Sequence, residues 1–231
     1  MEYNKYLSII TNFGCHYKCP YCVVKTNGIR VPATTIEGLD TLKDAVAHEK
    51  ATIISVSGGG DPLHQYHKHR AYYKKLFKLC DDMDIPLEMH TSYFNVRKFP
   101  YEKCYRVVYH LRDINDIRKI KRHGNEKVRI VFVVTEDFTG EKIYSIQNEF
   151  TSNKNIDELT FRQMVDRNYR TTDYCQDILI GGHKKAWYYV EQDDYNPYYV
   201  NGTIYYQFSD IGSGGEEYET LDYKENDDVC I

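Results

Sequence analysis

The segment YLSIITNFGCHYKCPYC, residues 6 to 22, joins a short apolar run to three closely spaced cysteines. The apolar run, Tyr6 to Thr11, predicts a buried strand. Gly14 and Pro20 discourage a helix in the part that follows. We therefore expect a strand that leads into an irregular loop carrying Cys15, Cys19 and Cys22.

The spacing of these cysteines indicates chemistry at a metal or a cluster. Thiolates that share one loop prefer soft metals, either zinc or the irons of an iron–sulfur cluster. A structural zinc site usually takes four ligands in paired elements, and no second CxxC follows in the sequence. A [4Fe–4S] cluster normally takes four thiolates, so three would leave one iron open to a small ligand. A zinc loop and three unrelated cysteines remain the alternatives.

Short apolar runs alternate with helical patterns up to about residue 166. Strands are expected at 6–11, 52–57, 86–91, 106–110, 128–135 and 158–164. Helices are expected from Thr34, which has capping-box spacing to Glu37, and at 64–82, 114–123 (closed by Gly124) and 141–150. Such alternation implies right-handed βαβ units and a parallel sheet. Because a full barrel has eight strands, we expect an α/β fold of the partial (β/α)6, TIM-like barrel type.

The pattern changes after about residue 166. The stretches AWYYVEQ (186–192) and YNPYYVNGTIYYQF (195–208) predict an aromatic antiparallel β-hairpin, with Asn201-Gly202 as its tight turn. This part is too small to offer much core of its own. We therefore divide the chain into a barrel core, residues 1–166, and an extension packed on the barrel, residues 167–231, that ends in an acidic tail.

A glycine-rich turn, SGGGDPL (57–63), follows the second expected strand. Glycines let a backbone come close to a ligand without interference from a Cβ atom. The carboxyl ends of parallel strands are also where ligands bind in open α/β sheets. The turn is therefore a candidate binding element beside the cysteine loop.

The sequence CHYKCPYC resembles the CxxxCxxC signature of the radical S-adenosylmethionine (radical SAM) superfamily, including the aromatic Tyr21 before the third cysteine. That family carries its cysteines after the first strand of a partial barrel and a GGE-type turn after the second, where Asp61 here replaces the usual Glu. The resemblance implies a [4Fe–4S] cluster on Cys15, Cys19 and Cys22, with SAM at the open iron. It further implies cofactor contacts from Tyr21, Gly58, Gly59, Gly60 and Asp61.

Polar residues at other strand ends are further candidates for contacts to SAM. The three that we select are Ser92, His110 and Arg162, ahead of His90, Thr91 and Thr135. An arginine in an otherwise apolar strand is costly unless it is paired, which makes Arg162 the leading candidate partner for a carboxylate. Each of these residues could instead satisfy a local hydrogen bond, and no catalytic residue is assigned.

Charge and composition bound the setting of the protein. The net charge is −4, but residues 97–129 hold eleven Lys/Arg against four Asp/Glu, and residues 191–231 hold eleven Asp/Glu against one Lys. A solvated helix face explains the basic stretch most simply, with a phosphate-bearing substrate or nucleic acid as the alternative. No apolar run approaches the length that spans a membrane, and the odd, scattered cysteines favour a reduced, cytoplasmic location.

The functional hypothesis is a radical SAM enzyme that cleaves SAM reductively to a 5′-deoxyadenosyl radical and abstracts hydrogen from a small-molecule or nucleotide-like substrate. The resemblance implies a one-electron reductant, such as flavodoxin or ferredoxin. Tyrosines and polar groups mixed in residues 181–199 suit a planar or sugar-bearing substrate, or they simply pack on the barrel. The alternatives are radical SAM modification of a macromolecule (a peptide, a glycyl-radical enzyme or nucleic acid) and a non-catalytic zinc-binding protein.

Overall fold

The computed structural model describes residues 4–181, 186–191 and 196–212. Within these ranges the strands form one nine-stranded sheet in the order β7-β6-β5-β4-β3-β2-β1-β8-β9. The first six strands pair in parallel, each with the next: β1 (Tyr6–Thr11), β2 (Ile53–Gly58), β3 (Leu87–Thr91), β4 (Arg106–Leu111), β5 (Lys127–Val134) and β6 (Glu158–Gln163). The six strand predictions and the α/β class are confirmed.

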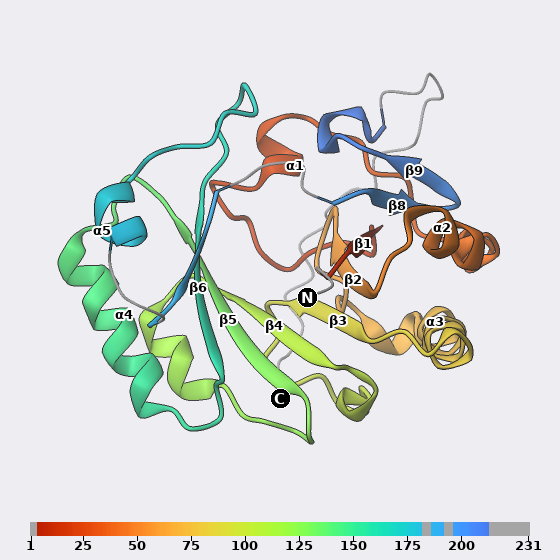
Figure 1. The fold of residues 1–231 in the computed structure, drawn as a ribbon, viewed down its shortest axis with the longest axis horizontal. Coiled ribbons are helices and arrows are strands. Elements are labelled where there is room, and N and C mark those ends of the chain that lie inside the picture. Colours follow the sequence, from red (N-terminus) through yellow and green to blue (C-terminus); the bar gives the residue numbers. More distant parts are fainter. Residues whose placement is uncertain (1–3, 182–185, 192–195, 213–231) are drawn as a thin grey trace.

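Helices connect these strands on one side of the sheet. In Figure 1, α2 (Leu42–Glu49) and α3 (Arg70–Met83) lie outside the β1–β3 end, and α4 (Gly140–Ser152) and α5 (Gln176–Gly181) lie outside the β5–β6 end. A short helix, α1 (Val23–Thr26), follows the cysteines. Single 3₁₀ turns complete the connections: η1 (Glu37–Leu39), η2 (Tyr66–Lys68), η3 (Tyr101–Lys103), η4 (Ile114–Lys119) and η5 (Phe208–Asp210).

The two faces of the sheet differ sharply. Alternate strand residues such as Leu7, Ile54 and Leu87 pack with Leu76 of α3 and Ile146 of α4 in one large core. The residues between them point to the other face, which in the register of the strands carries Ser55, Glu88 and Arg106 side by side. Parallel sheets are usually apolar on both faces, so this polar face marks where the fold departs from plain packing.

A second, smaller core packs the segment after the cysteines against the sheet. It joins Ile10 of β1 to Val24, Val31, Val200 and Ile211. Ile10 points to the same face of β1 as Ser8, and Asn12 continues that alternation after the strand. This core therefore covers part of the face opposite the helices. The cysteine segment is thereby fixed across the β1 end of that face.

The C-terminal strands add to both edges of the sheet. The tight turn at Asn201-Gly202 joins β8 (Tyr198–Val200) to an antiparallel β9 (Thr203–Tyr205), as predicted, with φ values of 44° and 93° at the two turn residues. The stretch AWYYVEQ does not join this hairpin, and its strand β7 (Tyr188–Val190) pairs in parallel with β6. β8 pairs in parallel with β1. Two edges with unpaired backbone groups were available, so the aromatic stretches were divided between them.

Four expectations about helices differ from the structure. The Thr34–Glu37 capping box does not form, because Thr34 Oγ1 accepts a hydrogen bond from the amide of Asn12 at 2.7 Å. The helix expected at 114–123 is only the 3₁₀ turn η4, whose N-cap Asp113 accepts from the Asn115 amide. Gly124 is not a C-cap; its amide donates to Glu126 Oε2 at 2.7 Å. The helix expected from residue 64 begins at Arg70.

Some expectations fall outside the described residues. They are the acidic tail beyond residue 212 and the polar groups at 183 and 192–194 that were considered for substrate contact. Within the described ranges, no helix is long and apolar enough to cross a membrane.

Candidate functional site

The three cysteines lie where the sequence places them, on the loop after β1. Each thiol is half-buried and free of any disulfide. The amide of Tyr17 donates to Cys15 Sγ at 3.4 Å, and the amide of Cys22 donates to the carbonyl of Cys19 at 3.2 Å. Burial, with smaller contributions from Asp61 and Cys19, raises the pKa of Cys15. Cys15, Cys19 and Asp61 are therefore electrostatic neighbours.

The glycine turn after β2, Gly58 to Asp61, is fastened directly to this loop. The Asp61 amide donates to the Gly14 carbonyl at 2.9 Å, and the Gly59 amide donates to the Thr11 carbonyl at 2.7 Å. A Cβ atom at Gly60 would overlap the Gly14 carbonyl. The close approach that requires glycine is thus made by the cysteine loop itself, a reason that differs from the ligand approach expected from the sequence.

Asp61 ties the glycine turn to the end of β3. Its buried carboxylate, 5% exposed, accepts hydrogen bonds from Thr91 Oγ1 at 2.8 Å and from the amide and hydroxyl of Ser92 at 2.6 and 2.5 Å. It also accepts from the Leu63 amide at 2.9 Å. Two of the predicted site residues, Asp61 and Ser92, are therefore partners of each other, and they hold the turn in place.

Tyr21 and an arginine that the sequence reasoning missed flank Cys19. Burial and the neighbouring Cys19 raise the pKa of Tyr21 well above its ordinary value. Arg112, directly after β4, lies over the ring of Tyr17 at 3.7 Å from its centroid. Burial raises the pKa of Cys19, and the positive charge of Arg112 opposes this shift. The sequence signal that could have identified Arg112 is its position, one residue after the end of a strand.

Aromatic rings brace the other side of the cysteine loop. The ring of His16 lies 4.0 Å from that of Tyr17 and 3.9 Å from that of Tyr93. The Tyr93 hydroxyl is 2.9 Å from Nδ1 of His64, and burial lowers the pKa of both histidines. His16, Tyr93 and His64 thus form a packed support for the loop.

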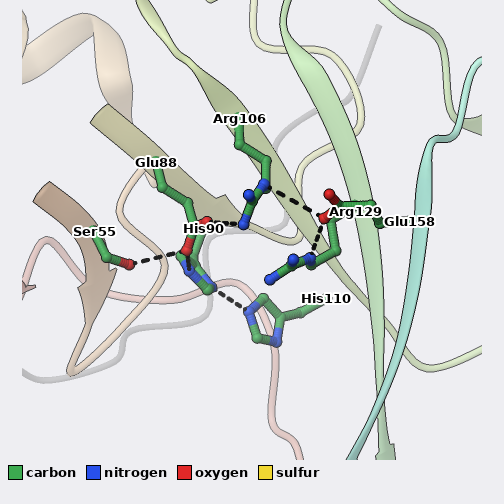
Figure 2. A network of polar contacts seen from close by, with 7 residues as sticks. All are labelled: Ser55, Glu88, His90, Arg106, His110, Arg129 and Glu158. Atoms are coloured by element: carbon green, nitrogen blue, oxygen red, sulfur yellow. Dashed lines mark hydrogen bonds and ion pairs between the residues drawn. The ribbon is translucent and has the colours of Figure 1, made fainter. Parts of the chain in front are cut away.

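A second group of polar side chains crosses the polar face of the sheet, as Figure 2 shows. Glu88 is at its centre: it accepts from Arg106 at 2.7 Å, from Ser55 Oγ at 3.3 Å, and lies 2.7 Å from His90 Nε2. His90 Nδ1 lies 2.8 Å from Nε2 of His110. Beyond Arg106 the network continues through Glu158 to Arg129, with N–O distances of 3.5 and 2.6 Å.

This polar network lowers the pKa of both Glu88 and His110, which leaves the acid charged and the base neutral. Burial alone would raise the pKa of Glu88, but the hydrogen bond and charge of His90 and the charge of Arg106 overcome it and lower the pKa to about 2. Burial lowers the pKa of His110 well below its ordinary value, and the charges of His90 and Arg162 act in the same direction. Glu88 is therefore an ionised, buried carboxylate, and His110 is held neutral.

The predicted site residues thus fall into two groups. Around the carboxyl ends of β1 and β2 lie Cys15, Cys19, Cys22, Tyr21, Gly58, Gly59, Gly60, Asp61 and Ser92. The polar face carries His110 on β4 and Arg162 on β6. Thr135, a weaker candidate, donates a hydrogen bond from its hydroxyl to the carboxylate of Asp137, two residues further along the chain. The network of Glu88, Arg106, Arg129 and Glu158 was missed because their strands were interpreted as buried, apolar elements.

The basic stretch 97–129 is partly neutralised by ion pairs. Six of its eleven Lys/Arg residues are in ion pairs: Lys103, Arg106, Arg118, Lys119, Arg122 and Arg129. Their partners come from several elements, from Asp81 on α3 to Glu158 on β6. About half of the positive charges of this stretch are therefore paired with acidic side chains of the fold.

The donor set on the loop matches an iron–sulfur cluster in kind. Three half-buried thiols share one loop, and thiolates are the ligands that such clusters take. In the part of the chain that the structure describes, no three His, Cys, Asp or Glu side chains are arranged to hold a metal ion. The three cysteines therefore fit such a cluster by the chemistry of their thiols and by sharing one loop, but their sulfurs are not arranged around a metal ion in this structure.

The fold and the loop define a mainly parallel α/β protein with three cysteines at the carboxyl end of its first strand. Ten solved chains match this structure. One is SuiB of Streptococcus suis, crystallised bound to S-adenosylmethionine, with a TM-score of 0.55 and 14% identity over 83% of this chain and 48% of that chain. This chain spans about half the length of SuiB, and the two share a fold. No family model and no curated protein matches the sequence.

Proposed function

We propose that this protein is a radical SAM enzyme, with Cys15, Cys19 and Cys22 as ligands of a [4Fe–4S] cluster. The observation that carries the proposal is the attachment of the three-cysteine loop to the glycine turn through the Asp61–Gly14 hydrogen bond. The fold likeness to SuiB, whose structure contains SAM, supports it. A reduced cluster of this kind supplies one electron that cleaves SAM to methionine and a 5′-deoxyadenosyl radical.

The residues of this chain bind and orient the cofactor. Backbone groups of Gly58, Gly59 and Gly60 face the loop and hold the methionine part of SAM. Asp61 and Ser92 fix that turn, since each is the hydrogen-bond partner of the other. Tyr21 covers the loop beside Cys19. Arg162, on the polar face, binds the carboxylate of SAM.

The finer features of the fold belong to the same proposal. The parallel strands β1–β6 form a partial (β/α)6 barrel, residues 1–166, with residues 167–231 as its extension. The protein works in the cytoplasm and receives its electron from a one-electron reductant such as flavodoxin or ferredoxin. The order of strands β1 to β6, each parallel to the next, supports the barrel.

The proposed substrate is a small or nucleotide-like molecule on the polar face. This face carries Arg106, Lys127, Arg129 and Arg162 against Glu88 and Glu158, an excess of two positive charges among these strand residues. A cluster of polar side chains on an otherwise apolar sheet suits a ligand with hydrogen-bonding groups. The ion pairs within the basic stretch 97–129 disfavour nucleic acid as the substrate.

Metal analysis of the anaerobically reconstituted protein tests the cluster. We expect about four irons and four sulfides per chain and the brown colour of a [4Fe–4S] cluster. Cys19→Ala should lose most of this iron, whereas Cys175→Ala, a half-buried cysteine far along the chain that contacts Phe138, should keep it. One zinc, no sulfide and a colourless protein would instead support the zinc-binding alternative.

A further inference from the structure

Three side chains of the polar network form a continuous hydrogen-bonded chain that no step above uses. It runs from Glu88 and His90 on β3 to His110 on β4 (Figure 2). Glu88 and His90 are 5% and 16% exposed, and His110 is half-buried. The chain therefore runs from the buried Glu88 to a half-buried ring on the polar face.

The hydrogen bonds fix which nitrogen of each histidine carries a proton. The Glu88 carboxylate accepts from Arg106 and Ser55, and an ionised carboxylate can only accept. The Nε2 of His90, at 2.7 Å, must therefore be the donor. A neutral His90 then has an unprotonated Nδ1, which requires that the neighbouring Nε2 of His110 donate across their 2.8 Å contact.

The same reasoning leaves Nδ1 of His110 unprotonated. In Figure 2 this second nitrogen of the His110 ring points away from His90. The charged groups that bear on His110 are His90 and Glu88 from β3 and Arg162 from β6. In these surroundings a second proton on the His110 ring is disfavoured, because burial and the charge of Arg162 oppose the positively charged form.

We propose that Glu88, His90 and His110 form a proton relay that opens at His110 Nδ1 and serves a ligand with an ionisable O–H or N–H group. This inference rests on the proposed function only for the presence of a substrate on the polar face. His110 is the residue that touches the ligand. His90 and Glu88 are positioning residues that act through it.

The proton transfer balances without any oxidant or reductant. The ligand's O–H or N–H bond breaks, its electron pair stays on the ligand, and a new N–H bond forms at His110 Nδ1. The proton on His110 Nε2 passes to His90 Nδ1. The positive charge then lies on His90, beside the Glu88 carboxylate, and the new anion lies on the side of Arg162. The reverse steps return the proton.

Long-range ¹H–¹⁵N spectra of the full chain, labelled at histidine, test the relay without any cofactor. At neutral pH we expect the ring proton of His110 on Nε2 and the proton between His90 and Glu88 on His90 Nε2. A proton on Nδ1 of His110, or the absence of one from Nε2 of His90, would overturn the relay. Exposed His48, on α2, is the internal reference.

Two variants separate a relay from a merely structural network. Glu88→Gln keeps the shape but removes the charge, and should move the titration of His110 to lower pH, because the Glu88 charge favours the protonated form of His110. Ser55→Ala removes only the 3.3 Å hydrogen bond to Glu88 and should leave the titration within a few tenths of a unit. An unchanged titration in Glu88→Gln contradicts the proposal; if that variant does not fold, the wild-type tautomers still decide.

The test is independent of the proposed function. A chain that shows the expected tautomers but fails to bind SAM would retain the relay and lose the radical SAM assignment. A chain that binds SAM but carries the His110 proton on Nδ1 would retain the assignment and lose the relay.

Discussion

The backbone amide of Asp61 donates a 2.9 Å hydrogen bond to the carbonyl oxygen of Gly14, the residue before the first cysteine. This bond joins the loop after β1 to the turn after β2. It leaves no room for a side chain at Gly60, whose Cβ would overlap the same carbonyl. The two motifs that the sequence suggested are thus one structural unit.

Gly60→Ala should break this unit. The added methyl group must displace the Gly14 carbonyl, and overpacking of this kind costs roughly 1–3 kcal/mol. We expect a lower free energy of unfolding in urea and less iron bound after reconstitution. Gly124→Ala is the matched control, because the nearest atom to its Cβ is the end of a flexible side chain, Glu126, at 3.2 Å. Equal stability and iron content in the two variants would contradict this view of the turn.

The Asp61–Ser92 pair should contribute measurably to stability. Hydrogen bonds to a charged acceptor contribute about 1.5–3 kcal/mol each, and Ser92 donates two of them. Ser92→Ala removes the hydroxyl bond but leaves the amide bond. A double-mutant cycle of Ser92→Ala with Asp61→Asn should give a coupling energy above about 0.5 kcal/mol. Strict additivity of the two substitutions would show that the pair does not act together.

Arg112 should hold the cysteine loop through its contact with Tyr17. A cation over an aromatic ring contributes about 0.5–2 kcal/mol, and here the guanidinium carbon lies 3.7 Å from the centroid. Arg112→Ala should therefore speed amide hydrogen exchange in residues 15–22. Arg118→Ala, which removes only an exposed pair with Glu149, should leave that exchange unchanged. No difference between the two variants would remove Arg112 from the support of the loop.

Acid should destabilise the protein through Glu88. Its pKa is about 2 in the folded protein against an ordinary 4.5, so the folded state favours the ionised carboxylate. Such a group stabilises fully above pH 4.5, and the effect is lost as pH falls from there toward about 2. The free energy of unfolding of the wild type should drop over this window, by roughly 3 kcal/mol for a shift of this size. In Glu88→Gln the drop should be smaller; an equal drop would contradict the shift.

His110 should affect the free energy of unfolding at higher pH than Glu88 does. Its lowered pKa means that, below its ordinary value of 6.5, the unfolded chain binds the proton more readily than the folded chain. Stability should therefore fall as pH decreases below 6.5. Urea unfolding at stepped pH should show a shallower fall in His110→Gln than in the wild type. A wild-type slope retained in His110→Gln would contradict a neutral His110 with a lowered pKa.

Much of the fold could be predicted from the sequence because its strands are short apolar runs with clear turn signals between them. The β8–β9 hairpin was predictable since Asn201-Gly202 suits a turn with two positive φ angles. The place of β7 was not, because pairing with β6 depends on an open edge that no local pattern reveals. The helix expected at 114–123 failed because Asp113 caps only a 3₁₀ turn.

The candidate site divides in the same way. The cysteine loop and the glycine turn are each one continuous stretch of sequence, so the residue spacing within each stretch suggested it. The Glu88–His90–His110 chain is assembled from two strands. Its residues alternate with Leu87, Met89 and Tyr109, which lie in the apolar core. The strong apolar signal of these strands concealed a polar face that only the register of the sheet makes visible.

The central claim is tested most directly by 5′-deoxyadenosine formation. The anaerobically reconstituted wild type, given SAM and dithionite, should release 5′-deoxyadenosine and methionine. Cys175→Ala should do the same, and Cys19→Ala should release neither above background. A wild type that carries the cluster but leaves SAM intact, or a Cys19→Ala variant that cleaves SAM as the wild type does, would contradict the account.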